Sequence, residues 1–419
     1  MIPQTKELGT NRKVFSKRKI RATFLPFSAP SIGEEEIAEV VDTLRSDWLA
    51  TGPKVERFER EFAAFLTVPS ALALNSGTAA LHLALASLDI GPGDAVITTP
   101  MTFCSTVHVI EQVGARPILV DVEPDTLNID PQRIEDTLKS EIRNPKCEIK
   151  AVLPVHLYGH PCEMEQILRL ASHNNWAVIE DAAHALPARY KGRLIGSPNP
   201  YSEGHIPNLI CFSFYATKNL TTAEGGMLIG PPTILEKARV LSLHGMNRNA
   251  WKRYSSEGSW YYEVVAAGFK YNLTDIAAAL GLHQLRKLSL LHARRRQIAA
   301  RYQEAFSQIE ELEVPVARSE VEHAWHLYIL RLNLERLRIS RNQFIEELRA
   351  RNIGTSVHFI PVHIHPYYRN RYGFKPNDFP VAYQEYQRML SLPLYPKMKD
   401  QDVEDVINAV LQAVQKFRK

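Results

Sequence analysis

Short apolar runs alternate with amphipathic stretches through the first half of this 419-residue chain. The runs have the composition of buried strands, and the stretches between them have helical periodicity. We expect strands at 71–74, 95–98, 117–120, 150–154, 177–180, 209–212 and 227–229, and helices at 33–46, 53–66, 78–88, 105–113, 131–138 and 164–173. Buried strands separated by helices indicate a mainly parallel sheet that is covered on both faces. The pattern therefore predicts an α/β fold.

The pattern changes after Asp275. The chain is too long for one small core, and its last third lacks the regular alternation. We expect a long basic helix at 285–306, a strand at 326–332, a helix at 341–351, a strand at 355–359 and a final helix at 401–417. The predicted organisation is a basic leader (1–24), a large domain (25–284) and a smaller α+β C-terminal lobe (285–419).

The composition is ordinary for a soluble globular protein, with 45% apolar and 23% charged residues. The net charge is only +4, and much of the excess comes from Lys and Arg in the leader. A solvated leader is favoured over one that binds nucleic acid or lipid. No apolar run reaches the roughly 18 residues of a membrane span. The four cysteines lack metal-binding spacing, which fits a cytoplasmic protein without disulfides.

One lysine stands out in the turn between the apolar runs 209–212 and 227–229. The nearest charged residue to Lys218 in the sequence is Glu224. Burial would lower the pKa of the Lys218 ammonium, and the neutral amine could then form a Schiff base with an aldehyde. From this stretch alone, a lysine that caps a strand end and points to water is an equal alternative.

Two further groups follow expected strands, at the edge of the sheet where ligands bind. Gly77 and Thr78 begin a helix whose free N–H groups favour a phosphate, although a plain helix cap has the same pattern. Asp181 could hold a proton on a heterocyclic nitrogen, or it could cap a helix. His184 could face the same ligand, or it could be a hydrogen-bonded core histidine.

Ser213 and Phe103 complete the candidate site. Ser213 ends the 209–212 strand and could bind phosphate or act as a cap. Phe103 could stack on a ring, although ordinary core packing is slightly favoured by its local sequence. Together these residues supply what pyridoxal phosphate (PLP) needs: a lysine amine, an anion for the ring nitrogen, a phosphate cradle and a stacking partner.

From about residue 25 to residue 414 the chain resembles the DegT/DnrJ/EryC1/StrS family of sugar aminotransferases. The matching stretches are 47–53 (DWLATGP), 75–80 (NSGTAA), 121–126 (DVEPDT), 154–159 (PVHLYG), 180–184 (EDAAH), 190–192 (YKG), 213–219 (SFYATKN), 224–226 (EGG) and 271–275 (YNLTD). The resemblance implies the PLP-dependent transferase fold type I, which is aspartate-aminotransferase-like, with residues 25–284 as the PLP-binding domain.

The resemblance also implies a role for each matching residue. Lys218 matches the lysine that binds the cofactor covalently, and Asp181 matches the partner of the ring nitrogen. Gly77, Thr78 and Ser213 match the phosphate cradle, and Phe103 occupies the stacking position. His184 stands where most of the family has glutamine near the ring hydroxyl. Asn272 matches an asparagine that reaches the cofactor phosphate of a neighbouring subunit, which implies a homodimer with shared active sites.

The implied reaction is transamination of a nucleotide-linked keto sugar, at C4, with glutamate as donor and 2-oxoglutarate as the second product. The branch that the chain most resembles makes UDP-4-amino-4-deoxy-L-arabinose, and it also has histidine at the position of His184. Alternatives are a sugar 3-keto aminotransferase, the family's dehydratase branch, which lacks the lysine, and a non-enzymatic PLP-binding regulator.

His358 and Phe359 are candidates for contact with the sugar nucleotide. Strand alternation over 355–359 would place the two side chains on opposite faces. Both could line the site only if the strand ended near His358. One core residue and one exposed residue is an equal alternative.

Overall fold

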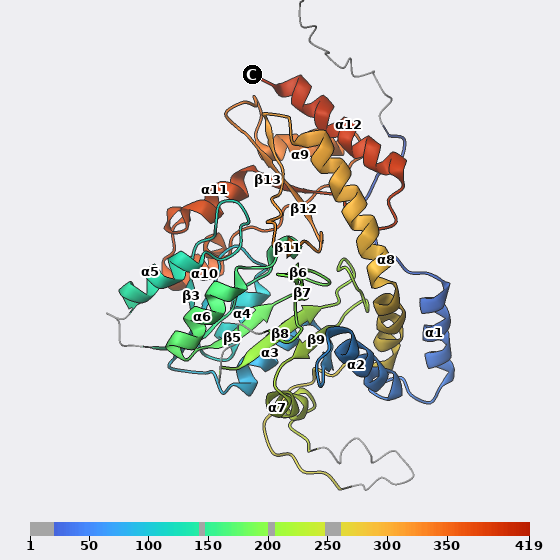
Figure 1. Ribbon diagram of the computed structural model, residues 1–419, viewed down its shortest axis with the longest axis vertical. Coiled ribbons are helices and arrows are strands. Elements are labelled where there is room, and N and C mark those ends of the chain that lie inside the picture. The colour runs from blue at the N-terminus through green and yellow to red at the C-terminus, as the bar shows by residue number, and fades with distance from the viewer. Residues whose placement is uncertain (1–20, 142–146, 200–205, 248–260) are drawn as a thin grey trace, which may run out of the picture.

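The computed structural model describes residues 21–141, 147–199, 206–247 and 261–419 (Figure 1). Its centre is a seven-stranded sheet with the order β1-β9-β8-β5-β4-β2-β3. The strands are β1 (Leu72–Leu74), β2 (Asp94–Thr98), β3 (Arg116–Leu119), β4 (Glu148–Val152), β5 (Ala177–Asp181), β8 (Asn208–Ser213) and β9 (Gly226–Ile229). Strand β9 runs antiparallel to β1 and β8, and the pairs from β8 through β3 are parallel. The predicted mainly parallel sheet is confirmed.

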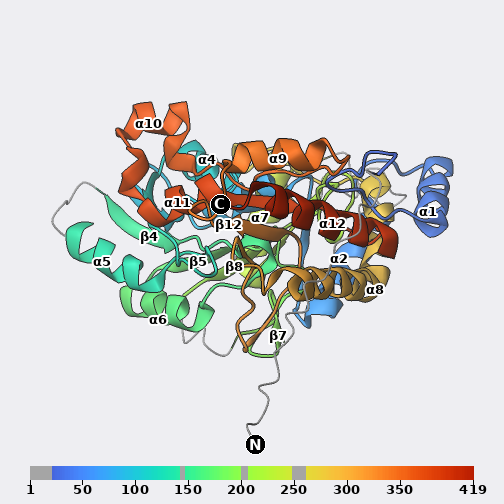
Figure 2. The ribbon, with the colours of Figure 1, turned by 90° about the horizontal axis from the view of Figure 1, so that it is seen from above.

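Side chains alternate between the two faces of this sheet and build a core on each. On one face, Ile97 and Val178 pack with α2 (Pro53–Leu66), α5 (Pro131–Glu141) and α6 (Met164–Asn174). On the other, Val96 and Ile179 pack with α3 (Gly77–Ser87), α4 (Ser105–Gln112) and α7 (Pro232–Ser242). Figure 2 shows α4 and α6 on opposite sides of β5. The sheet is therefore covered on both faces, as the apolar strands require.

Helix α8 (Asp275–Phe306) connects this sheet to a smaller lobe (Figure 1). Near its start it packs on α1 (Glu34–Arg45) and α2, and near its end Ile298 and Phe306 enter a separate core. Leu25 belongs to that separate core and bridges to Ile353. The helix is continuous across residues 284 and 285, so the expected domain change falls inside it. The lobe also contains β10 (Leu312–Glu313), β12 (Tyr328–Leu332), β13 (Met389–Leu392), α9 (Arg341–Arg349) and α12 (Asp400–Phe417).

The expected strand at 355–359 is wrong. Apart from a bridge between Ser356 and Ser391, the segment has no strand pairing. Other contacts hold it instead: the Tyr158 hydroxyl donates to the carbonyl oxygen of His358, and the His358 ring bonds to the Ser391 hydroxyl. These partners are distant in sequence, so local alternation could not reveal them.

The remaining elements are short and connect the larger ones. They are β6 (Arg189–Tyr190), β7 (Arg193–Leu194), β11 (Val321–Glu322), α10 (Pro366–Tyr372), α11 (Pro380–Arg388) and the 3-10 turns η1 (Leu157–Gly159), η3 (Val362–Ile364) and η4 (Pro376–Asp378). Within the described ranges, none of the helices combines the length and apolar character that crossing a bilayer requires.

Candidate active site

A pocket of about 460 Å³ opens where the carboxyl ends of β5 and β8 meet the start of α3. This is the edge at which open parallel sheets bind ligands. The residues singled out in the sequence that line it are Gly77, Thr78, Phe103, Asp181, His184, Ser213, Lys218, His358 and Phe359. The fold thus brings together side chains that lie up to hundreds of residues apart in the chain.

Lys218 lies in a well-anchored turn after β8. The side-chain amide of the neighbouring Asn219 donates to the carbonyl oxygens of Leu186 and Ala324, both at 2.8 Å. Burial lowers the pKa of Lys218 to about 8, and the Asp181 carboxylate acts against that shift. A substantial fraction of this amine is therefore neutral just above neutral pH, as a nucleophile requires.

Asp181 ends β5 with its carboxylate buried beneath the pocket. Its Oδ2 accepts a hydrogen bond from the Thr106 hydroxyl at 2.8 Å, and its Oδ1 accepts one from the Ala183 N–H at 3.1 Å. Burial raises the pKa of this carboxyl, because these donors and the nearby charges only partly offset the loss of water. A cation held against the remaining lone pairs would compensate for that loss.

The start of α3 forms a narrow cradle beside Ser213. The Ser76 hydroxyl caps the helix by accepting from the Ala79 N–H at 3.0 Å. A Cβ atom added to Gly77 would lie 2.8 Å from Cβ of Ser213, so only glycine allows this close approach. The first N–H groups of a helix have no acceptor within it. The cradle therefore offers backbone donors and a hydroxyl to an anion such as a phosphate.

Neutral histidines form one wall of the pocket. The Tyr158 N–H donates to Nδ1 of His184 at 3.2 Å, so the His184 proton is on Nε2. Nδ1 of His326 lies 3.3 Å from Oδ1 of Asn219. The side-chain nitrogen of Asn219 already donates to the carbonyl oxygen of Leu186, which identifies Oδ1 as the amide oxygen. This oxygen can only accept, so the His326 proton is on Nδ1. Burial lowers the pKa of both rings well below the usual value. Burial also lowers the pKa of His358 to about 4.

The rings of Phe359 and Phe103 extend this wall beyond His184. The Phe359 ring stacks on His184, with centroids 5.9 Å apart and an interplanar angle of 15°. Phe103 lies 6.0 Å from Phe359 and is 57% exposed at the pocket. This exposure excludes the alternative that Phe103 is ordinary core, and its stacking role stays a prediction. His358 and Phe359 both line the pocket because their segment is irregular rather than a strand.

Asn272 does not line the pocket of its own chain. Its side-chain amide donates to Oγ1 of Thr51 at 2.5 Å. The turn before α8 therefore gives this amide a partner within the chain, which the sequence did not suggest. This contact links 271–275 to the 47–53 loop, both of which are among the stretches that resemble the family.

Several lining or supporting residues received no role from the sequence. Tyr158 lies within the 154–159 stretch that resembles the family, and His326 begins the strand expected at 326–332. Neither pattern has a spacing that reveals the contacts of these residues. Thr106 carries no local signal at all, because a threonine inside a helix is common. A search for polar residues one helical turn beyond Thr102, which also lines the pocket, could have found it: the two hydroxyls lie 2.7 Å apart.

The comparisons with known proteins agree with this geometry. The model of the DegT/DnrJ/EryC1/StrS aminotransferase family matches residues 30–411. The spore coat polysaccharide biosynthesis protein SpsC of Bacillus subtilis is 52% identical over 396 residues, which cover 94% of this chain and 98% of SpsC.

Two solved aminotransferase structures have the same fold. Spr1654 of Streptococcus pneumoniae, described as a sugar aminotransferase and solved in its PMP form, is 34% identical with a TM-score of 0.83, covering 94% of this chain and 98% of that one. Helicobacter pylori PseC, an aminotransferase of pseudoaminic acid biosynthesis, is 26% identical with a TM-score of 0.82, covering 94% of this chain and 100% of PseC. The chain belongs to the DegT/DnrJ/EryC1/StrS aminotransferase family of PLP-dependent sugar aminotransferases.

Proposed function

We propose that this enzyme transfers an amino group from glutamate to C4 of a nucleotide-linked keto sugar. The observation that carries the proposal is the convergence of the Lys218 amine, the buried Asp181 carboxylate and the anion cradle of α3 on one pocket. The product would be an amino sugar nucleotide for a cell-surface glycan, lipid A or a secondary metabolite. The name of SpsC, which refers to spore coat polysaccharide, supports the first of these uses.

The residues of the pocket fit PLP. Gly77, Thr78 and Ser213 would hold its phosphate, because the helix start and the hydroxyl converge there. Asp181 would hold a proton on the ring nitrogen, and Phe103 would stack on the ring. His184 would donate from Nε2 to the ring hydroxyl, since its Nδ1 is occupied by the Tyr158 N–H. When bound, PLP supplies an aldehyde that takes up amines and a ring that withdraws electrons from the substrate carbon.

Lys218 has two tasks in this proposal. It binds the resting cofactor through its neutral amine, which the pKa of about 8 makes accessible. With its amine free, Nζ of Lys218 would take a proton from the substrate carbon and hold it for transfer to an adjacent atom. The rigid turn around Asn219 keeps this amine within reach of the reacting atoms.

Asp181 acts through charge. Its carboxylate keeps the ring nitrogen protonated, so negative charge that develops on the substrate carbon is stabilised. The two donors to Asp181 leave lone pairs for this task and fix the orientation of the carboxylate. His358 and Phe359 would contact the sugar nucleotide, which is supported by their place in the lining of the same pocket.

The active enzyme is proposed to be a cytoplasmic homodimer with shared sites. Four free cysteines support the compartment. Asn272 would reach the cofactor phosphate of the neighbouring subunit, and a two-fold axis would return the same contact. The absence of Asn272 from its own pocket is consistent with this arrangement. The Thr51 contact would orient the amide toward the neighbour.

The direct test is incubation of the PLP-loaded enzyme with glutamate and a panel of keto sugar nucleotides, followed by mass spectrometry and NMR of the products. An amino group at C4 supports the proposal. Amination at C3 would replace it with the 3-keto reaction, and no amination of any sugar nucleotide by enzyme that accepts an amine from glutamate would refute the nucleotide-linked substrate.

A further inference from the structure

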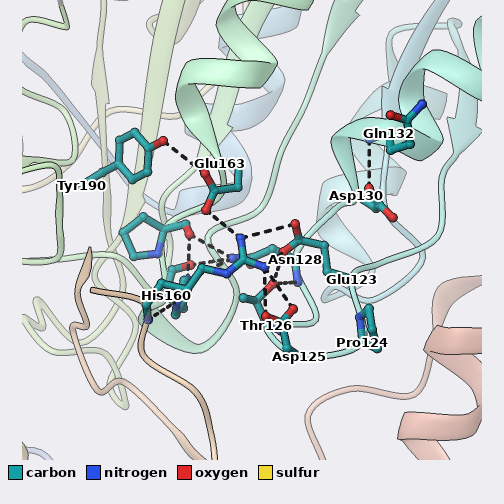
Figure 3. A network of polar contacts seen from close by, with 12 residues as sticks. Glu123, Pro124, Asp125, Thr126, Asn128, Asp130, Gln132, His160, Glu163 and Tyr190 are labelled. Carbon is teal, nitrogen blue, oxygen red and sulfur yellow. Dashed lines mark hydrogen bonds and ion pairs between the residues drawn. The ribbon is translucent and has the colours of Figure 1, made fainter. Parts of the chain in front are cut away.

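Tyr158 has an unusual backbone conformation for a large residue. It lies in the η1 turn with φ 60° and ψ −1°, in the left-handed region. Bulky side chains rarely adopt this conformation, and where they do, the surrounding contacts must hold them there. The turn is held from below by Asn128, whose Oδ1 accepts from the Leu157 N–H at 2.9 Å. Asn128 also donates to the carbonyl oxygen of His160 at 3.0 Å (Figure 3).

The polar groups of Tyr158 reach every segment that carries a pocket histidine. Its N–H donates to Nδ1 of His184. Its carbonyl oxygen accepts from the N–H groups of His326 and Leu327, at 3.1 and 3.2 Å. Its hydroxyl donates to the carbonyl oxygen of His358 at 2.5 Å. Tyr158 thus bonds to all three of these segments through its own polar groups.

These contacts lie on both sides of the ring stack formed by His184 and Phe359. Tyr158 holds His184 through its backbone and holds His358, the residue bonded to Phe359, through its hydroxyl. The His184 and Phe359 rings between these two anchors lie 5.9 Å apart. The alternative acceptor of the hydroxyl is the Met389 sulfur at 3.6 Å, which is a weak one. Burial raises the pKa of the Tyr158 hydroxyl, so it remains a donor at working pH.

We propose that Tyr158 is a positioning residue for the acceptor half-reaction: its hydroxyl sets the place of His358 and Phe359 against the sugar. This inference rests on the proposed function, because it takes the His358–Phe359 wall as the sugar side. Lys218, Asp181 and the cradle serve both half-reactions, and none of them receives a hydrogen bond from the Tyr158 hydroxyl, whose partners are His358 and Met389. The Tyr158 hydroxyl should therefore affect one half-reaction and spare the other.

The test compares Tyr158→Phe with Tyr302→Phe. Tyr302 is a matched control: it is fully buried in the small lobe, and its hydroxyl also donates to a backbone carbonyl, that of Pro393, at 2.9 Å. Both variants lose one buried hydrogen bond and should lose similar stability. Misplacing a substrate-positioning group by about 1 Å can lower an enzyme's rate ~100-fold. We expect a misplaced wall to weaken sugar binding on a similar scale, so the KM for the sugar nucleotide should rise about 10- to 100-fold in Tyr158→Phe alone. Single-turnover loading by glutamate, followed by absorbance, should match the control.

Two results overturn the proposal: a sugar KM in Tyr158→Phe equal to that of Tyr302→Phe, or an equal loss in both half-reactions. Ser391→Ala removes the hydrogen bond between the Ser391 hydroxyl and the His358 ring and tests the same wall without changing Tyr158. An acceptor-specific rise in KM supports the proposal, and an unchanged KM overturns it.

A crystal structure separates this inference from the proposed function. If wild type aminates no UDP- or dTDP-linked 4-keto-6-deoxyhexose, the proposed function fails. The positioning role is then decided by the distance between the Phe359 and His184 rings in Tyr158→Phe: a changed distance supports it, and the wild-type distance overturns it.

Discussion

Replacing Asp181 with asparagine should separate catalysis from folding. The carboxylate accepts from Thr106 and Ala183. An asparagine can keep the bond from Ala183 through its oxygen. Thr106 can then donate to Thr102, 2.7 Å away, and accept from the new amide. The local structure should therefore survive, while the charge that holds the proton on the cofactor's ring nitrogen is lost.

The size of the effect follows from the burial of the group. Breaking a desolvated ion pair costs about 3–5 kcal/mol, which corresponds to roughly 10²- to 10⁴-fold in rate. The assay is single-turnover amine transfer from glutamate, followed by the absorbance of the cofactor. The matched control is Glu180→Gln, because Glu180 is on the same strand but contacts His156 and Asn208 away from the pocket. A near-normal rate for Asp181→Asn would show that Asp181 only supports the strand end.

Asp181→Asn should lower the rate, but it should not lower the stability of the apoprotein. Folding raises the pKa of Asp181. An acid with a raised pKa weakens the fold at pH values above that pKa, and the penalty disappears below its ordinary pKa. At pH 8, Asp181→Asn apoprotein should therefore melt no lower than wild type, while at pH 4 the advantage should shrink. A large fall in Tm at pH 8 would mean that the carboxylate is needed by the apoprotein itself.

The other predictions concern the amine, the wall and the assembly. Lys218→Ala should retain the cofactor through its phosphate but lose transamination, and turnover within tenfold of wild type would exclude its assigned role. The rate of cofactor attachment to wild-type apoprotein should rise with pH through about 8, because only the neutral Lys218 amine reacts; a rate independent of pH between 7 and 9 would contradict this. His358→Ala should raise the KM for the sugar without slowing amine transfer from glutamate, and an equal loss in both would indicate a general defect. Mixing Lys218→Ala with Asn272→Asp should restore activity to as much as about a quarter of wild type, since half of the random dimers contain one sound site; continued inactivity after confirmed subunit exchange would refute shared sites.

The large sheet could be predicted because its signals are local. Each strand is a short apolar run, and helices begin at recognisable caps such as Ser76. The functional polar residues follow the carboxyl ends of parallel strands, which meet at one edge of the sheet. The sequence alone therefore predicts that Asp181 and Ser213 lie near each other. The PLP assignment needed the resemblance as well, because Lys218 alone was equally compatible with a surface lysine.

The segment around His358 shows where this reasoning fails. Thr355 to Phe359 alternates like a strand, yet its backbone is held by the Tyr158 hydroxyl and by a bridge to Ser391, both distant in the sequence. The contact between Asn272 and Thr51 was missed for the same reason, because the two residues lie far apart in the chain. Local patterns predict an element only when its backbone hydrogen bonds close within the element or along a regular ladder.

The two halves of the site therefore differ in how the chain holds them. The cofactor side is built from strand ends and a helix start, whose geometry follows from the sheet itself. The histidine wall depends on one tyrosine in a strained turn, whose three polar groups span His184, His326 and His358. If His358 and Phe359 contact the sugar as proposed, small shifts of their segment would change that contact while Lys218 and Asp181 stay fixed. We expect differences in sugar preference among related enzymes to arise from the wall and its anchor, and differences in cofactor chemistry to arise from the sheet edge.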